Sequence, residues 1–177
     1  MPVQYNISTL LGEPVGSTRE HEIDDAFVID GELPHRQEVT GHARLLKTKA
    51  GVLVTASLAG TGREACSRCL REIDVPVRLD IEEEFHASTD PESGVRLPPP
   101  EDPEAFRIDS QQTLDLEEAL RQGWAAAQPM RALCREECRG LCSRCGKDLN
   151  EGNCACPPEQ DERWGALREL AREREGK

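Results

Sequence analysis

The sequence predicts an α+β protein in which an antiparallel, β-rich N-terminal meander or barrel-like region precedes helices and a small cysteine-rich segment. Three observations lead to this prediction. Residues 1–86 contain runs rich in Val, Ile, Leu and Thr that alternate like strands and are separated by turn signals. Residues 111–177 contain two stretches with helical periodicity. Six of the eight cysteines lie between residues 134 and 156.

Five runs in the first 86 residues are expected to be strands. They read QYNIS, HEIDDAFVID, QEVTGHARLLKT, GVLVTASLAG and IDVPVRLDIEEEF. Turn-forming residues separate them at 12–14, 30–31, 50–51 and 60–62, the last being Gly-Thr-Gly. Several strands joined by short turns favour antiparallel pairing of neighbours, in an open sheet or a closing barrel.

Residues 87–110 are expected to form an acidic, proline-rich loop. This stretch holds five of the twelve prolines and six acidic residues. Few of its side chains can pack in a core, so the segment is predicted to be a solvated connection with little regular structure.

Two helices are expected in the third region, residues 111–177. In the first, LDLEEALRQGWAAAQPM, acidic residues occupy the first turn and Pro129 ends the run. The second is expected to begin at Asp161 as N-cap and to bury Trp164, Leu167 and Leu170. The predicted apolar face of the first helix consists of Leu116, Ala119, Leu120, Trp124 and Ala127.

The chain is expected to stay in the reducing cytoplasm. Its start, MPVQYNISTLLGEP, lacks the basic region and apolar run of a signal peptide, and no stretch approaches 18 apolar residues. No membrane association is therefore expected. Disulfides rarely persist in such a compartment, so eight cysteines point first to metal ligation and second to redox chemistry.

The clearest metal-binding pattern lies in the C-terminal third. Cys142 and Cys145 have the spacing of a zinc knuckle and are followed by a glycine. Cys154 and Cys156 follow after the turn-rich stretch GKDLNEGN, which lets the chain fold back. These four thiols are predicted to bind one zinc ion.

The remaining four cysteines suggest a second zinc site. Cys66 and Cys69 form another pair at knuckle spacing, and Cys134 with Cys138 would place two thiols on one side of a helical turn. Such a site would join the β-rich region to the C-terminal segment. Other groupings remain open, such as Cys138 with the pair at 142 and 145, as do unligated thiols, redox chemistry and an iron–sulfur cluster.

No enzymatic activity and no small-molecule substrate are predicted. Four protein thiolates leave zinc no open position for a substrate. The stretch GTGREA matches a loose dinucleotide-binding pattern, but CSRC follows it where an apolar helix is required, so a turn between strands is expected there. The four histidines are scattered and form no recognisable motif.

Charge is distributed unevenly along the chain. The formal net charge is −12, and residues 76–118 contain 13 acidic residues against three arginines. This composition makes the whole chain a poor candidate for coating RNA phosphates. The cysteine-rich segment is locally basic, and its cations are predicted either to offset zinc-bound thiolates or to contact RNA or another partner. These residues are Arg131, Arg135, Arg139, Arg144 and Lys147.

Several motifs together resemble the YceD-like family, the large ribosomal RNA subunit accumulation proteins of bacteria and plastids. In chain order they are LLGEPVGSTRE, CSRCL, EEEF, LDLEEALRQ, PMRALC, CRGLCSRCGKDLN, CAC and DERWGALREL. The resemblance covers most of the chain, and CRGLCSRCGKDLN is its most specific part.

The resemblance implies a non-enzymatic role in synthesis, processing or stability of the 23S ribosomal RNA. The expected partner is then a large-subunit ribosomal RNA precursor or a basic ribosomal protein, for which the chain would act as an acidic chaperone. The alternative is a zinc-dependent protein-interaction adaptor with no ribosomal link.

Overall fold

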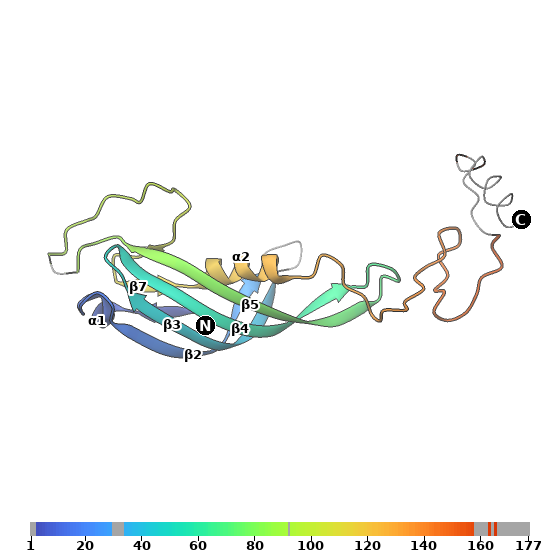
Figure 1. The fold of residues 1–177 in the computed structure, drawn as a ribbon, viewed down its shortest axis with the longest axis horizontal. Coiled ribbons are helices and arrows are strands. Elements are labelled where there is room, and N and C mark those ends of the chain that lie inside the picture. The colour runs from blue at the N-terminus through green and yellow to red at the C-terminus, as the bar shows by residue number, and fades with distance from the viewer. Residues whose placement is uncertain (1–2, 30–33, 92, 158–162, 164, 166–177) are drawn as a thin grey trace, which may run out of the picture.

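The fold is built on a curved, twisted sheet of four long antiparallel strands, described here in a computed structural model (Figure 1). Residues 3–29, 34–91, 93–157, 163 and 165 are described. The sheet order is β2-β3-β4-β5-β6, in which only the short β6 runs parallel to its neighbour. The predicted α+β class with a β-rich meander is therefore confirmed. The strands are β2 (Thr18–Ile29), β3 (His35–Lys47), β4 (Gly51–Ala65), β5 (Glu72–Ala87) and β6 (Arg107–Ile108).

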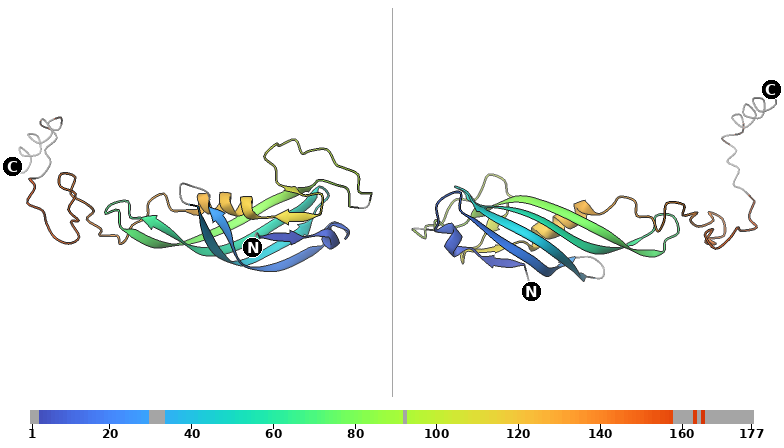
Figure 2. Two further views of the ribbon diagram at one scale, coloured as in Figure 1. Left: turned by 180° about the vertical axis from the view of Figure 1, so that it is seen from behind. Right: turned by 60° about the horizontal axis from the view of Figure 1, so that its bottom comes forward.

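The inner face of the curved sheet is covered by the remaining elements (Figure 2). Strand β1 (Gln4–Asn6) pairs antiparallel with β7 (Thr113–Asp115), and the one-turn helix α1 (Ser8–Leu11) follows β1. Helix α2 (Glu117–Ala127) lies against β5 and β2. The covering elements close one apolar core with the sheet, as expected of a two-layer domain.

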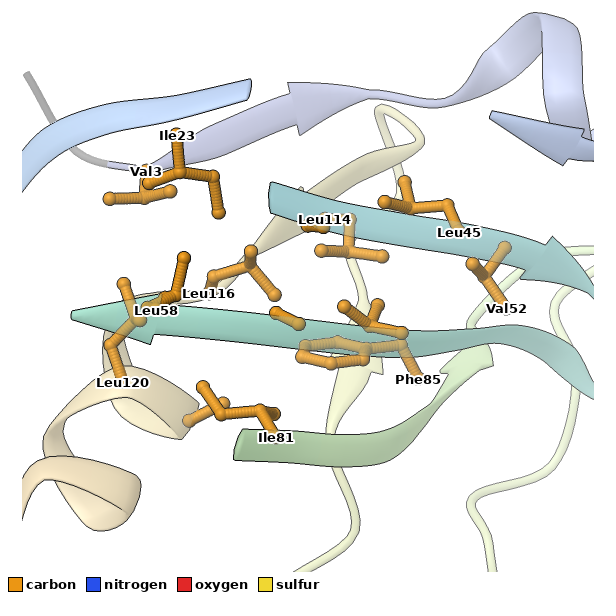
Figure 3. Close-up of a cluster of buried hydrophobic side chains, with 14 of the residues drawn as sticks. Val3, Ile23, Leu45, Val52, Leu58, Ile81, Phe85, Leu114, Leu116 and Leu120 are labelled. Carbon is orange, nitrogen blue, oxygen red and sulfur yellow. The ribbon is translucent and has the colours of Figure 1, made fainter. Parts of the chain in front are cut away.

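Alternation of buried and exposed side chains along the strands produces this core (Figure 3). In β4, Val52, Val54, Ala56 and Leu58 point inward and are buried, whereas the residues between them are more exposed. The predicted apolar face of α2 is also confirmed, because Ala127 packs against the core and the other four residues are buried.

One predicted turn is wrong, and its glycines serve another purpose. Gly60 and Gly62 lie inside β4, on its inner face. A Cβ atom added to Gly60 would lie 2.6 Å from the Glu38 carbonyl oxygen and 2.9 Å from Trp124 Cζ3, and one added to Gly62 would lie 3.2 Å from Trp124 Cζ2. The glycines are therefore packing positions for a tryptophan, where the sequence pattern suggested a turn.

The sequence also misplaced several short elements. Strand β1 ends at Asn6, and its partner is β7 instead of the meander. Leu114 and Asp115, expected at the start of the first helix, belong to β7. The 87–110 segment packs more than expected, since Ile108 is buried and Phe106 stacks on Phe85 with ring centroids 5.0 Å apart. Apart from residues 163 and 165, the predicted helix from Asp161 lies outside the described residues.

The β4–β5 hairpin extends beyond the rest of the sheet. The β3–β4 pairing stops at Val39 and Gly60, but the β4–β5 pairing continues to Ala65 and Glu72. Five further residues of β4 therefore pair with β5 alone. They carry the hairpin tip toward residues 130–157, called the C-terminal segment from here on (Figure 1). The tip contains Cys66 and Cys69.

Candidate metal centres

The tip of the β4–β5 hairpin is a tight turn that carries two cysteines, Cys66 and Cys69. Leu70 N–H donates to the Cys66 carbonyl at 2.9 Å, and Cys66 N–H donates to the Arg71 carbonyl at 2.8 Å. The backbone N–H groups of Cys69 and Arg68 point at the Cys66 sulfur and, with further donors, lower the pKa of this thiol to about 6. A thiol with this pKa is substantially ionised at neutral pH, which is the form that binds metals.

The same turn occurs again in the C-terminal segment. Gly146 N–H donates to the Cys142 carbonyl at 2.9 Å, and Cys142 N–H donates to the Lys147 carbonyl at 2.9 Å. The backbone N–H groups of Cys145 and Arg144 lower the pKa of the Cys142 thiol to about 6. Both turns have the sequence Cys-Ser-Arg-Cys, a repeated tetrapeptide that could have signalled two equivalent knuckles from sequence alone.

The residue after each knuckle adopts a left-handed conformation. Its φ is +60° at Leu70 and +70° at Gly146. This conformation costs an L-residue about 1–2 kcal/mol, whereas glycine adopts it freely.

Leu70→Gly is therefore expected to stabilise the protein by about 0.5–1 kcal/mol, after allowing for the greater freedom of glycine in the unfolded chain. The Leu70 side chain is 66% exposed, so little buried area is lost. Urea unfolding of the metal-loaded protein measures the difference. Gly146→Leu is the matched control and should destabilise; a destabilised Leu70→Gly variant would show that the leucine side chain makes contacts that outweigh the strain.

The first set of four thiols lies between the hairpin and the C-terminal segment, with Cys134 half-buried and the other three, Cys66, Cys69 and Cys138, buried. Its sulfur atoms all lie within 4.8 Å of one another, with Cys66 and Cys138 3.9 Å apart and Cys69 and Cys134 3.7 Å apart. Zinc–thiolate bonds of about 2.3 Å in a tetrahedron require sulfur separations of about 3.8 Å. The set could hold one metal ion with little rearrangement, and it includes the upstream pair, as predicted.

The second set lies entirely within the C-terminal segment and is more accessible to solvent. The sulfur atoms of Cys142, Cys145, Cys154 and Cys156 lie within 4.8 Å of one another, and Cys142 and Cys154 are 3.4 Å apart. Cys145 is exposed and the other three are half-buried. The predicted set of four therefore also comes together. The alternative grouping of Cys138 with this pair does not, because Cys138 belongs to the first set.

In both sets the sulfur atoms lie so close together that the charge of one thiolate opposes ionisation of another, and a bound cation would offset this charge. Hydrogen bonding to the Cys138 thiolate, with burial, raises the pKa of Cys134 to about 12. In the second set, hydrogen bonding to Cys145, again with burial, raises the pKa of Cys156 to about 12. Adjacent thiolates repel one another, so the Cys134 and Cys156 thiols keep their protons unless a metal ion neutralises the group.

The first set joins segments that also hold each other directly. Ser67 N–H donates to the Ala132 carbonyl at 2.9 Å, and Leu141 N–H donates to the Arg68 carbonyl at 3.1 Å. The Arg68 guanidinium in turn donates to the Cys138 carbonyl at 2.7 Å. Few apolar side chains contribute to this junction, so the contact between hairpin and C-terminal segment depends on backbone hydrogen bonds and on the thiol cluster.

Most of the predicted partner-contacting cations are engaged within the C-terminal segment. Arg135 donates to Asn150 Oδ1 at 2.8 Å, and Arg139 donates to Asn153 Oδ1 at 2.6 Å. Lys147 donates to the Asn153 carbonyl at 3.1 Å. These three residues hold the 146–153 loop, which favours a structural role for them. All five cations are exposed, and Arg131 and Arg144 take no part in these loop contacts.

Asn150 is the site residue that the sequence reasoning missed. It lies in the turn-rich stretch between Cys145 and Cys154, where an asparagine was expected only to shape a turn. In the structure, its Nδ2 lies 3.5 Å from the sulfur of Cys138, a thiol of the other set. No local sequence signal marks such a contact.

Comparison with known proteins gives a family but no solved fold. A family model described as "Large ribosomal RNA subunit accumulation protein YceD" matches residues 54–171. Uncharacterized proteins of Mycobacterium tuberculosis and Mycobacterium bovis are 30% identical over 127 residues, which is 72% of this chain and 59% of each relative. One of Mycobacterium leprae is 27% identical over 106 residues, 60% of this chain and 46% of the relative.

The chain thus spans less than two thirds of the length of these relatives. No solved structure matches it. Among the described residues, no helix has the length and apolar character needed to cross a membrane.

Proposed function

Because the chain belongs to the YceD family, we propose that it is a non-enzymatic factor in biogenesis of the large ribosomal subunit and that it holds two structural zinc ions. The family match carries this proposal. It spans residues 54–171, which include most of β4, all of β5 and α2, and the whole of both thiol sets. The part of the chain that resembles the family is therefore the part that carries the candidate metal centres.

Zinc is the metal that this ligand chemistry favours. Both sets offer four sulfur atoms, and sulfur ligands with tetrahedral spacing suit zinc or an iron–sulfur centre. Each set also contains a Cys-x-x-Cys knuckle with backbone N–H groups directed at its first sulfur, a common arrangement in structural zinc sites. Four protein ligands leave no position for a substrate, so these ions would stabilise structure and would not perform catalysis.

Electrostatics favour a basic protein as the direct partner over bare RNA. The formal net charge is −12 with neutral cysteines, and a zinc ion with four thiolates carries −2, so two such centres would bring the total to about −16. Arg135, Arg139 and Lys147 are already hydrogen-bonded inside the C-terminal segment. These bonds compete with phosphate contact by the cations of that segment.

The acidic surface that a basic partner could use begins on the outer face of β5. Asp80 and Glu82 are exposed there, in register with Ser57 and Thr55 of β4. Further exposed acids follow in the loop that leaves the sheet after β5. These are Glu101, Asp102 and Glu104.

Capture of the tagged protein from its own host at low salt tests the proposed function. The expected result is co-purification of large-subunit RNA precursor with early ribosomal proteins. Transcription proteins in place of ribosomal components would contradict the proposal and support the adaptor alternative.

Two variants captured in parallel identify the direct contact. Replacing Glu82, Glu101 and Glu104 by glutamine should release a basic ribosomal protein, whereas replacing Arg131 and Arg144 by alanine should leave the captured set unchanged. If RNA is contacted directly, the arginine variant should instead lose it, and the capture should weaken steeply as salt is raised.

A further inference from the structure

The two candidate metal centres are in physical contact through the loop of residues 146–153. This loop connects Cys145 to Cys154 and so belongs to the second thiol set, called the exposed set from here on because it is the more accessible one. The first set is called the buried set. It folds back on the chain that leads out of the buried set, where Leu149 N–H donates to the Gly140 carbonyl at 2.8 Å. The loop therefore has its two ends at thiols of the exposed set and its middle against the chain of the buried set.

Asn150 makes the most direct contact between the loop and the buried set. Its Nδ2 donates to Cys138 Sγ at 3.5 Å and to Asp148 Oδ1 at 2.6 Å. Its Oδ1 accepts from Arg139 N–H at 2.9 Å and from the Arg135 guanidinium at 2.8 Å. Both N–H bonds and both acceptor positions of the amide are used, which fixes the orientation of the side chain.

A donor held in this way acts on the metal through its ligand. An N–H group directed at a thiolate stabilises the charged form that binds metal, and groups in this position orient the ligand. Cys138 is 2% exposed, so water has little access to replace a donor that is lost. The contact is therefore expected to contribute to metal affinity at the buried set.

We propose that Asn150 couples the two centres, so that a metal ion in the exposed set increases metal affinity in the buried set. The inference depends on the proposed pair of zinc ions. A metal in the exposed set holds both ends of the loop, at Cys145 and Cys154, and keeps Asn150 against Cys138. Without that metal the loop is tethered only by hydrogen bonds, and the position of Asn150 is less restricted. Linkage makes the coupling reciprocal.

Metal competition on the full chain tests the coupling. Co²⁺ and Zn²⁺ are titrated against a chelator for the wild type, for Asn150→Ala, and for a Cys154→Ser, Cys156→Ser variant that disables the exposed set. Affinity at the buried set should fall about 10- to 100-fold in either variant. Combining the changes should cause no further loss, because both act through the same hydrogen bond.

Two additional variants separate the donor from general loop structure. Asn150→Asp keeps the acceptor oxygen but removes the N–H group, so it should lower buried-set affinity as the alanine variant does. Asn153→Ala, in the same loop, removes a bond to Arg139 and no thiol contact, so it should leave that affinity unchanged. With ¹¹³Cd as the probe, the buried-set resonance should shift in both Asn150 variants and stay in place in Asn153→Ala.

Failure of the coupling is distinguishable from failure of the proposed zinc sites. A wild-type protein that binds fewer than two metal ions would overturn the zinc proposal itself. If two ions bind but Asn150→Ala leaves the buried-set affinity unchanged, the centres are independent and the coupling is wrong. Additive losses in the combined variant would likewise overturn the role of Asn150 as the link.

Discussion

Replacing Cys66 and Cys69 together by serine is expected to reduce bound zinc from two ions to one and to release the C-terminal segment from the β4–β5 hairpin. Each of these thiols belongs to the buried set, and the serine hydroxyls are poor zinc ligands. The two remaining members, Cys134 and Cys138, cannot hold a structural zinc ion alone. Binding energy that a metal supplies only to the folded state is lost with it.

The structural effect of replacing Cys66 and Cys69 is expected to be confined to the hairpin tip and the C-terminal segment. The hairpin tip lies beyond the last β3–β4 pair, and its thiols form a cluster separate from the main core. The sheet and α2 should therefore keep their packing, while amide exchange and proteolysis increase at residues 130–141. Elemental analysis gives the zinc content, and hydrogen exchange locates the released segment.

The second Cys-Ser-Arg-Cys tetrapeptide supplies the matched control. At saturating zinc, Cys142→Ser with Cys145→Ser should also lose one ion but leave the 130–141 segment protected, because the buried set is intact. A Cys66→Ser, Cys69→Ser variant that retains both ions would refute the assignment of four cysteines to each site.

The sequence predictions were correct where the interactions are local or leave a repeating pattern in the sequence. Alternation predicted four long strands, since burial of every second side chain leaves a repeating pattern. Knuckle spacing predicted both thiol sets, because a Cys-x-x-Cys turn is local and needs only a second pair of thiols to complete the site. Cys69 and Cys134 are 65 residues apart in the sequence. Their grouping was predicted because the four cysteines left after the other site was assigned are the number of ligands that one zinc ion binds.

Long-range contacts without a repeating pattern were missed. Pairing of β1 with β7 joins Tyr5 to Leu114, and no feature of either short segment indicates the other. The contact between Asn150 and Cys138 was missed for the same reason, because the neighbours of a metal ligand depend on how the loop folds. Gly60 and Gly62 were misread because glycine suits both a turn and a position under a large ring.

Trp124→Ala is expected to reduce the free energy of unfolding by about 3–5 kcal/mol. The Trp124 side chain is 2% exposed and packs between α2 and the sheet, with its ring edge-on to Phe27 at a centroid distance of 5.9 Å. Gly60 and Gly62 leave the space that it fills. Urea unfolding followed by circular dichroism gives the difference.

Trp124→Phe should cost much less than Trp124→Ala. The indole Nε1 is buried, and no hydrogen-bond partner for it is found among the described residues. Removing an unsatisfied donor recovers about 1–3 kcal/mol, which offsets part of the packing lost with the smaller ring. Equal losses in the two variants would show that the indole N–H is satisfied, for instance by a bound water molecule.

Gly62→Ala tests whether the glycines in β4 serve the tryptophan. In the wild type, the added Cβ would lie 3.2 Å from Trp124 Cζ2 and 3.5 Å from Val77 Cγ2, so the substitution should destabilise. In the Trp124→Ala background, the ring is absent, and the same methyl group should fill part of the cavity and recover stability. The sign of the Gly62→Ala effect should therefore reverse between the two backgrounds. An unchanged sign would mean that backbone conformation, and not the indole ring, requires glycine at this position of the strand.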